Sequence, residues 1–534
     1  MKNLLQKKSI ILLTIILLIG IVSFIKFPKS LDINYYNSDA TWHTLLTITA
    51  YDKTPISIHK FAPIVSLGGT DNKHVPWGLT IPDKEGNYYY TSFSAATFFI
   101  PYLFMKIFHL PINEISLYIF NTILFILSAY IWLLILKKIF KDSKFLNTTL
   151  FIGFLTYVFS PELLHGMGIV FWAQSIMQVT ILLQLYFFLN RKDKKIYKYL
   201  FYIFCIINPY IEWTGFIANI GFMITNFIEE FKINKKTTFV ETANILSLTI
   251  LSSILFCLHF LTTSISPSDF IFAIITRFLS RNVTTKISIY KLFKGYISSF
   301  SFLWILLILL FITNIITFKN INWVKNTHAY RNKTLIIILF FLIVENIIMK
   351  QHAVAYSYDR MKFVFLLVFL ICDWINLLLN KKETKKILVY IIVLLTFFCS
   401  LSNLIQYTNN NKYLWSAPFR TSNKILAEHI NINYENSILS SQEATIRGYN
   451  NLIFNKSIYE KISLTETIKI AKTKNKQFAI LLLSKGDERL NMSNFTGAYI
   501  YNLHSKNLIK IELKNNSIQE IPINYTEGDK DYDL

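Results

Sequence analysis

Long apolar runs separated by short polar segments fill most of the chain. Early runs cover residues 9–27, 115–136, 145–159 and 173–189, and later ones cover 242–261, 297–316, 334–349, 363–379 and 387–401. Each has about the length that a helix needs to cross a hydrocarbon core. The stretch 199–228 is broken by proline and a carboxylate at Pro209 and Glu212, which are costly at mid-bilayer, so we interpret it as two spans. The pattern predicts a polytopic α-helical membrane protein with about eleven transmembrane helices.

Three other stretches depart from this pattern. Residues 28–92 are polar and form a long loop after the first run. Residues 93–110 are apolar but contain Pro101, Lys106 and His109, which indicates an interfacial helix instead of a span. Beyond residue 402 the apolar runs shorten, and a strand-like run at 478–483 follows a helix-like stretch near 465–474. The sequence therefore predicts a transmembrane domain over 1–402 and a soluble α/β domain over 403–534.

Basic residues beside the apolar runs predict how the spans are oriented across the membrane. Lys2, Lys7 and Lys8 precede the first run, and no small-residue cleavage site follows it, so we expect a retained anchor with a cytoplasmic N-terminus. The loop 28–92 then lies outside the membrane. An odd number of spans places the domain 403–534 outside as well.

Composition agrees with a membrane protein and argues against both nucleic-acid binding and a cysteine-based site. The chain has 534 residues and is 53% hydrophobic, which is too apolar for a soluble core of ordinary proportions. Its net charge of +22 would suit nucleic acid, but the basic residues flank apolar runs, so no nucleic-acid binding is expected. The four cysteines lie inside apolar runs without CxxC spacing, which favours neither disulfides nor a thiolate metal site.

Unusual polar residues gather at the predicted outer ends of the spans. The loop after the first run begins with Asp39 and His43, and Glu212-Trp213 marks the broken stretch. Glu345 interrupts a span, where an ionisable group is expensive unless it faces a cavity or a partner. The segment after that span carries His352, Tyr358, Arg360 and Lys362. Folding is expected to gather these groups into one pocket at the membrane surface.

This arrangement resembles the GT-C glycosyltransferases, in the branch of the protein mannosyltransferases and the aminoarabinose transferases. The likeness rests on a short tail, one span, an outer loop opening with Asn37-Ser38-Asp39, interfacial helices, many spans and an outer soluble domain. The tract from His59-Lys60-Phe61 to Tyr90-Thr91-Ser92 is similar to first loops of bacterial members. Many members pair two acidic residues where this chain has Asp39-Ala40.

The resemblance implies a sugar transfer from a polyprenyl-phosphate donor. The phosphate leaves without protonation, so the site needs one base for the acceptor hydroxyl and cations for the developing charge. Asp39 is the expected base, with His43 orienting it. The alternative is that Asp39 caps the helix that follows, and the two roles are compatible. A divalent cation at Asp39 is possible, although no spacing of carboxylates demands one and no metal ligands are assigned.

Candidates for the donor phosphate are Arg360, Lys362 and His352, because a guanidinium matches phosphate oxygens in two bonds. Arg277 and Arg281, four residues apart, are a second pair. The alternatives are anchoring to lipid headgroups for the first group and a solvated helix face for the second. The expected substrate pocket is formed by Glu212, Trp213, Tyr358 and Glu345.

These expectations describe an inverting glycosyltransferase of the bacterial inner membrane, acting on a glycan, lipid or protein acceptor outside. A polysaccharide polymerase or ligase with a lipid-linked oligosaccharide donor is the alternative. A lipid or sugar transporter is a weaker one, because broken helices in matched halves are not seen.

Overall fold

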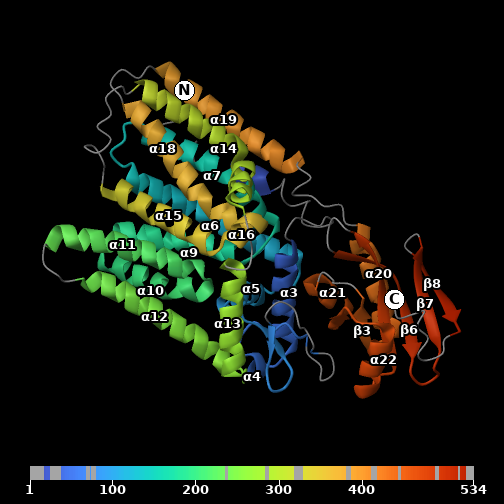
Figure 1. Ribbon diagram of the computed structural model, residues 1–534. Helices are drawn as coiled ribbons and strands as arrows, with labels where there is room; N and C mark the ends of the chain where they lie inside the picture. Colours follow the sequence, from blue (N-terminus) through green and yellow to red (C-terminus); the bar gives the residue numbers. More distant parts are fainter. Residues whose placement is uncertain are drawn as a thin grey trace.

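The computed structural model describes residues 17–23, 38–67, 73, 80–234, 239–282, 288–317, 329–380, 386–409, 418–442, 447–487, 492–514 and 517–524. It shows a helical bundle that extends to α19 and a smaller C-terminal unit built on a sheet (Figure 1). The first predicted span, 9–27, is described only at residues 17–23, which are helical. Parts of the predicted loop 28–92 also lie outside the described residues.

Helices α3 and α5 and a small hairpin form the part of the bundle that faces the C-terminal unit (Figure 1). Helix α3 covers Ser38–Lys53 and α4 covers Ile56–His59. Strands β1 (Thr80–Pro82) and β2 (Tyr88–Tyr90) pair antiparallel, with Ile81 opposite Tyr89. Helix α5, Ala95–Ile107, begins where the Ser94 side chain accepts a hydrogen bond from the Ala96 amide, which satisfies one of the unpaired donors at a helix start.

The bundle is built from long apolar helices joined by short connections. Its described helices are α6 (Glu114–Ile139), α7 (Leu146–Val158), α8 (Pro161–Leu164), α9 (Ala173–Asn190), α10 (Lys195–Ile211), α11 (Thr214–Asn234), α12 (Val240–Leu261), α13 (Pro267–Asn282), α14 (Ile289–Thr317), α15 (Ala329–Ile348), α16 (Lys350–Ala355), α17 (Ser357–Arg360), α18 (Val364–Asn380) and α19 (Lys386–Asn409).

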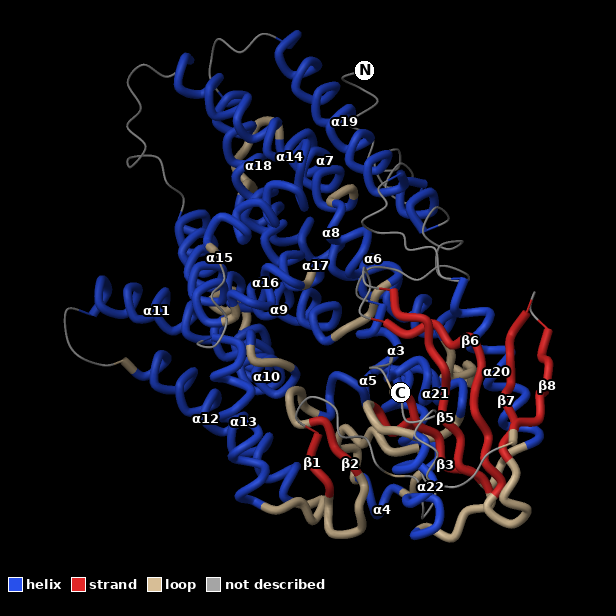
Figure 2. Tube along the Cα trace, turned by 45° about the vertical axis from the view of Figure 1, so that its right-hand side comes forward, coloured by secondary structure: helices blue, strands red, loops and turns tan. Residues whose placement is uncertain are grey.

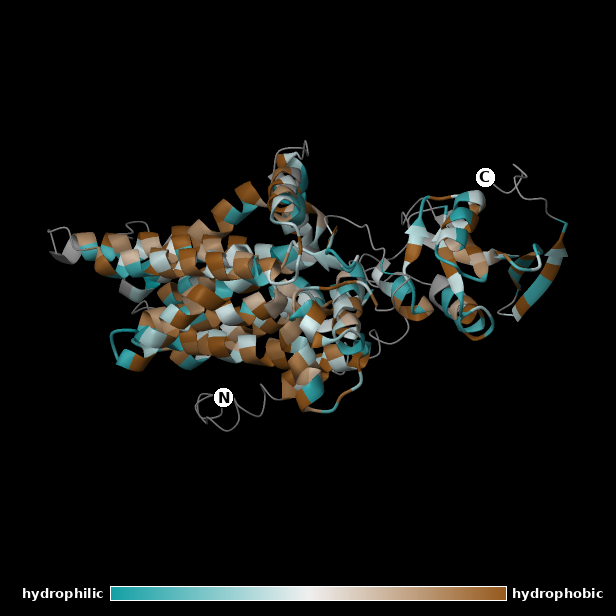
Figure 3. Ribbon diagram, turned by 90° about the horizontal axis from the view of Figure 1, so that it is seen from below, coloured by the Kyte–Doolittle hydropathy of each residue, from teal (hydrophilic) through white to brown (hydrophobic). Residues whose placement is uncertain are grey.

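Several of these helices are suited to a bilayer. Among the described residues, 5 helices are long and apolar enough to cross a membrane, or up to 6 if the bent pair α7 and α8 is one span. The outward faces of α12 and α19 carry exposed aliphatic side chains such as Ile250, Ile254, Ile391 and Leu394. A surface of this kind fits lipid and not water. Figure 3 shows the same contrast, with hydrophobic residues dominating the bundle and more hydrophilic ones on the C-terminal unit. The chain is a polytopic membrane protein.

Breaks in the helices place polar groups inside the bundle. Helices α7 and α8 meet at an angle of 57°. Helix α10 continues through Pro209 and ends at Ile211, so the predicted break in 199–228 falls at Glu212 and Trp213. The turn into α11 is tight, because a Cβ on Gly215 would lie 2.2 Å from the carbonyl carbon of Asn208. The break thus brings Glu212 into the bundle.

Charged side chains join several helices of the bundle. Arg191 at the end of α9 and Lys333 of α15 each lie 2.8 Å from Glu229 of α11. Arg331 of α15 lies 2.6 Å from Asp373 of α18. These pairs link helices that are distant in sequence.

The C-terminal unit is a mixed sheet covered by helices on both faces. Its strand order is β4-β3-β5-β6-β7-β8; β3 pairs parallel with β4 and β5, and the later pairs are antiparallel. The strands are β3 (Ser437–Ser441), β4 (Ile458–Glu460), β5 (Phe478–Asp487), β6 (Met492–Asn502), β7 (Leu508–Lys514) and β8 (Ser517–Ile523). Helices α20 (Pro418–Asn433) and α21 (Arg447–Phe454) cover one face and α22 (Leu464–Thr473) the other, as the two separate apolar clusters show.

Candidate active site

Asp39 lies in the first turn of α3, the helix that packs against α21 of the C-terminal unit. The residue is exposed, whereas the positions after it, Ala40 to Thr47, are buried. Desolvation by the surrounding protein nevertheless raises the pKa of its carboxyl above the usual 3.8, against the opposing effect of the Ala40 and Asp39 amides. The carboxylate is therefore reached by solvent although protein atoms surround it, which suits a base that must meet a substrate.

His43, one turn further along α3, is enclosed by aromatic rings. Its ring centroid lies 4.4 Å from that of Tyr90, 5.2 Å from that of Trp172 and 5.6 Å from that of Phe98. Burial, with a smaller contribution from the positive charge of Arg277, lowers the pKa of His43 to about 3. The imidazole is therefore neutral at physiological pH, so it packs α3 in place without adding charge beside Asp39.

Tyr356 and Tyr358 come from the segment after α16, and their rings stack with centroids 5.3 Å apart. Burial, with smaller contributions that include the negative charge of Asp39, raises the pKa of Tyr356 to about 12. The two tyrosines therefore bring a segment from late in the bundle close to the Asp39 carboxylate. Tyr358, a predicted pocket residue, is buried.

Arg277 supplies positive charge to this region from α13. Its Nη2 lies 3.5 Å from the hydroxyl of Tyr90, and its charge reaches both His43 and Tyr356. The residue is half-buried and lines a cavity. The side chain of Arg281, the other predicted arginine of α13, lies outside the described residues.

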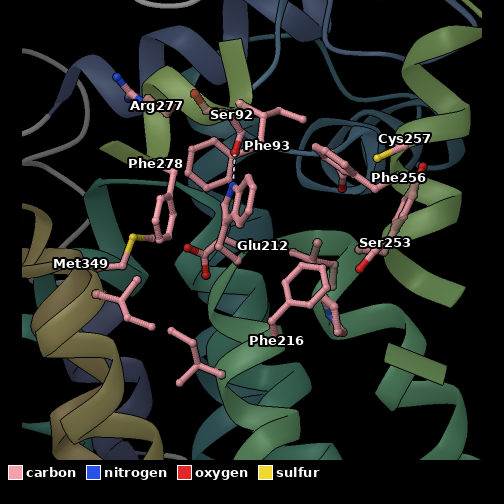
Figure 4. Close-up of a pocket in the computed structure, with 18 of the residues that line it drawn as sticks. Ser92, Phe93, Glu212, Phe216, Ser253, Phe256, Cys257, Arg277, Phe278 and Met349 are labelled. Carbon is pink, nitrogen blue, oxygen red and sulfur yellow. Dashed lines mark hydrogen bonds between the residues drawn. The ribbon is translucent and has the colours of Figure 1, made fainter. Parts of the chain in front are cut away.

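The cavity beside Arg277 has a volume of about 370 Å³ (Figure 4). Its walls come from α10, α11, α12, α13 and the end of α15 with Met349, together with residues 92–94, and they are mostly apolar. Glu212 points into the middle of the group, and Arg277 lies near Ser92 at its edge (Figure 4). The Trp213 indole N–H donates a hydrogen bond of 2.8 Å to the Ser92 carbonyl oxygen. An apolar space with one cation and one carboxylate suits an amphiphilic ligand with an anionic group.

Two carboxylates of the bundle, Glu212 of the cavity wall and Asp359, are held by polar partners. Gln174 of α9 donates through Nε2 to Asp359 at 2.6 Å and to Glu212 at 3.5 Å. Nδ1 of His352 lies 3.0 Å from the second oxygen of Asp359. The hydroxyl of Thr214 also bonds Glu212. Such partners offset the cost of removing ionised groups from water.

The two predicted cations of the segment 352–362 are buried in ion pairs. Arg360 is 2% exposed; its Nη2 lies 3.4 Å from Glu162, and it donates to Ser299 and to the Ala353 carbonyl, each at 2.7 Å. Lys362 is fully buried and pairs with Glu345. The structure therefore brings Asp39, His43 and Arg277 together around Tyr90 and Tyr356. It places Arg360, Lys362, His352 and Glu345 in the packed interior.

Three residues of this region were not among the predicted site residues. Asp359, Tyr356 and Gln174 link the predicted groups to one another. Asp359 and Tyr356 flank predicted residues in sequence, so their neighbourhood was a usable signal. Gln174 sits in an apolar run and carried no such signal. Within the described part of the chain, no group of three or more His, Cys, Asp or Glu side chains is placed to hold a metal ion.

The long apolar helices, with polar side chains gathered inside the bundle, define the chain as a polytopic membrane protein. A scan against protein-family models finds no match, and a search of curated proteins finds none either. Solved structures do match along almost the whole chain.

Two enzymes represent these structural matches. The apo oligosaccharyltransferase of Archaeoglobus fulgidus superposes with a TM-score of 0.57 at 10% identity, over 97% of this chain and 76% of that one. ArnT of Cupriavidus metallidurans, bound to undecaprenyl phosphate, gives a TM-score of 0.56 at 8% identity, over 89% of this chain and 93% of that one. The Archaeoglobus fulgidus oligosaccharyltransferase AglB, in complex with an inhibitory peptide and a dolichol-phosphate, superposes with a TM-score of 0.54. The resemblance to the GT-C glycosyltransferases is thereby confirmed at the level of the fold.

Proposed function

We propose that the chain is an inverting membrane glycosyltransferase, in which Asp39 removes the proton of an acceptor hydroxyl while a polyprenyl phosphate leaves the sugar. The observation that carries the proposal is the position of Asp39. In a fold shared with ArnT and AglB, this carboxylate lies in the first turn of α3 near Tyr356, on which the charge of Arg277 also acts, and Arg277 lines an apolar cavity.

The chemistry requires little of the protein beyond positioning and charge. The acceptor oxygen attacks the anomeric carbon, its proton passes to Asp39, and the bond to the phosphate oxygen breaks, so one displacement inverts the centre. Arg277 is the proposed partner of the departing phosphate, because it combines charge, access and a place on the cavity wall. The apolar walls suit the first isoprene units of the lipid.

Orientation in the membrane follows from the sequence and is part of the proposal. The N-terminus lies in the cytoplasm of a bacterial cell, about eleven helices cross the inner membrane, and the C-terminal unit lies outside beside Asp39. The ArnT structure contains undecaprenyl phosphate and the AglB structure a dolichol-phosphate, which supports a polyprenyl-phosphate carrier here. The acceptor is a glycan, a lipid or a protein.

An alternative donor is a lipid-linked oligosaccharide, and the likeness to an oligosaccharyltransferase favours retaining it. In that case a whole glycan and not one sugar moves to the acceptor. The base and the phosphate partner are the same in both versions. The mass of what is transferred distinguishes them.

The experiment compares cells that carry the wild type, Asp39→Asn or Asp52→Asn in place of the chromosomal gene, at matched protein levels. Asp52 is the control because it lies at the other end of α3, where it is exposed and pairs with Lys106. Mass spectrometry of lipid-linked sugars and surface glycans should show that Asp39→Asn accumulates a polyprenyl-phosphate sugar and loses one unit from a glycan. A wild-type profile in Asp39→Asn cells would refute Asp39 as the base.

A further inference from the structure

Helix α21 is held in the C-terminal unit by asparagine side chains. Asn423 of α20 donates to Oδ1 of Asn450 at 3.1 Å, and Asn431 donates to the Ile453 carbonyl at 3.0 Å. Oδ1 of Asn451 accepts from the Ile458 amide at 3.2 Å. Phe454, at the end of α21, belongs to the apolar core beneath the sheet. The position of α21 is therefore set by the C-terminal unit.

The same helix also packs against α3 of the bundle, as Figures 1 and 2 both show. The Tyr449 ring meets the Trp42 ring edge-on with centroids 4.7 Å apart, and Tyr449 belongs to the apolar core of the bundle. At the far end of the contact, Lys53 bonds Asn455, just after α21. Helix α21 thus lies along α3 and shares side chains with both apolar cores.

Gly448 allows a close approach between the two helices. A Cβ at this position would lie 2.8 Å from the His43 amide nitrogen and 2.8 Å from the Trp42 carbonyl carbon. Real Cβ contacts are not this short, and backbone atoms cannot rotate away as a flexible side chain does. Glycine inside a helix is less stable than alanine, so its presence here reflects a need for space and not for helix formation.

From this contact we infer that α21 positions the base: the depth at which Gly448 lets α21 rest on α3 sets where the Asp39 carboxylate stands relative to the cavity. The inference rests on the proposed function. Asp39 lies one helical turn before the residues that Gly448 touches, so a displacement of α3 at His43 is carried directly to it. Gly448 is a positioning residue, since it acts through α3 without touching substrate.

The test compares full-length Gly448→Ala and Gly448→Val with wild type and with Gly20→Ala. Gly20 is the matched control, because a Cβ there would meet nothing within 4 Å. A shift of about 1 Å in a reacting group is expected to lower the transfer rate about 100-fold. The loss should be greater for valine than for alanine. Affinity for undecaprenyl phosphate, used as the probe and measured by native mass spectrometry, should change less than about twofold.

The outcomes separate this inference from the proposed function. If Asp39→Asn is inactive while both Gly448 variants transfer at the wild-type rate, the positioning role is wrong and the base assignment stands. If Asp39→Asn itself is fully active, both fail. Loss of undecaprenyl phosphate binding together with rate in Gly448→Ala would indicate general misfolding and overturn the specific role.

A second variant keeps the inference testable if the Gly448 variants do not accumulate. Tyr449→Leu removes the contact with Trp42 and leaves room between the helices. It should lower the transfer rate while leaving the affinity for undecaprenyl phosphate unchanged. A wild-type rate in Tyr449→Leu would overturn the inference in that case.

Discussion

Gln174 donates a hydrogen bond of 2.6 Å to Asp359, although the two residues are 185 positions apart in the sequence. The same amide nitrogen lies 3.5 Å from Glu212. The neutral Gln174 side chain of α9 thus contacts two buried carboxylates. Glu212 lies at the break between α10 and α11, and Asp359 lies in α17.

Replacing this amide should destabilise the bundle. Gln174→Leu takes a donor from two buried carboxylates, and leaving such groups short of a partner costs about 1–3 kcal/mol or more. Gln178→Leu is the control, because Gln178 lies one turn further along α9 and donates only to the neutral Tyr157 hydroxyl, at 3.2 Å. Thermal unfolding in detergent should show a larger loss for Gln174→Leu. Equal losses would contradict a special role for the shared amide.

The pair Lys362 and Glu345 gives a second prediction, which separates a structural role from a role in phosphate binding. Lys362→Met leaves a buried carboxylate without its cation and should cost about 3–5 kcal/mol. The double variant Lys362→Met/Glu345→Leu should recover most of that stability. Transfer activity in the double variant is the deciding measurement. Recovery of activity along with stability supports a structural pair, whereas a stable but inactive double variant supports the predicted contact with phosphate.

Arg277 should affect donor binding through its charge. Arg277→Met keeps the length of the side chain but removes the guanidinium, and a hydrogen bond to a charged group is worth about 1.5–3 kcal/mol. The KM for the donor should therefore rise about 10- to 100-fold in Arg277→Met. Arg277→Lys should give a KM between those of the wild type and Arg277→Met. Steady-state kinetics at two salt concentrations provide the measurement. A fall in kcat with an unchanged KM would contradict donor binding by Arg277.

The raised pKa of Asp39 predicts the acid side of the pH profile. A base works only when it is ionised, so kcat/KM should fall as the pH drops through a value above the ordinary 3.8. His43, with a pKa of about 3, stays neutral over this range and should not cause the fall in kcat/KM at low pH, the acid limb. The acid limb should therefore persist in His43→Asn when kcat/KM is measured between pH 4 and pH 8 in steps of about half a unit. Disappearance of the acid limb in that variant would assign it to the histidine.

The raised pKa of Asp39 also makes the stability of the folded protein depend on pH. A carboxyl whose pKa is higher in the folded state binds protons more readily when folded, so its ionisation opposes folding as the pH rises above 3.8. At neutral pH Asp39→Asn should therefore unfold at a slightly higher temperature than the wild type, while at pH 4 the difference should shrink. A lower unfolding temperature for Asp39→Asn at neutral pH would show that the ionised carboxylate is well solvated.

Much of the fold follows from hydrophobic periodicity. The apolar runs 115–136, 242–261 and 387–401 lie within α6, α12 and α19, and the strand-like run 478–483 lies in β5. Periodicity reports which residues avoid water, so it finds helices and strands well. The number of spans and the orientation stay predictions.

Less of the candidate site follows from the sequence, because pairing between distant segments leaves no periodic signal. Sequence alone grouped Arg360 with Lys362 as candidates for the donor phosphate. In the structure Arg360 meets Glu162, 198 residues earlier, and Lys362 meets Glu345, 17 residues earlier. The approach of α21 to α3 depends on one glycine that looks unremarkable in a polar stretch.

The contact between Gly448 and the backbone of His43 also determines how early in synthesis the candidate site can be completed. Helix α3 is among the first parts to leave the ribosome, and α21 among the last. At synthesis rates of about 5–20 residues per second, tens of seconds separate their appearance. Throughout that interval the base helix lacks the element that supports it, so a nascent chain still held by the insertion machinery has no finished site with which to consume lipid-linked sugar.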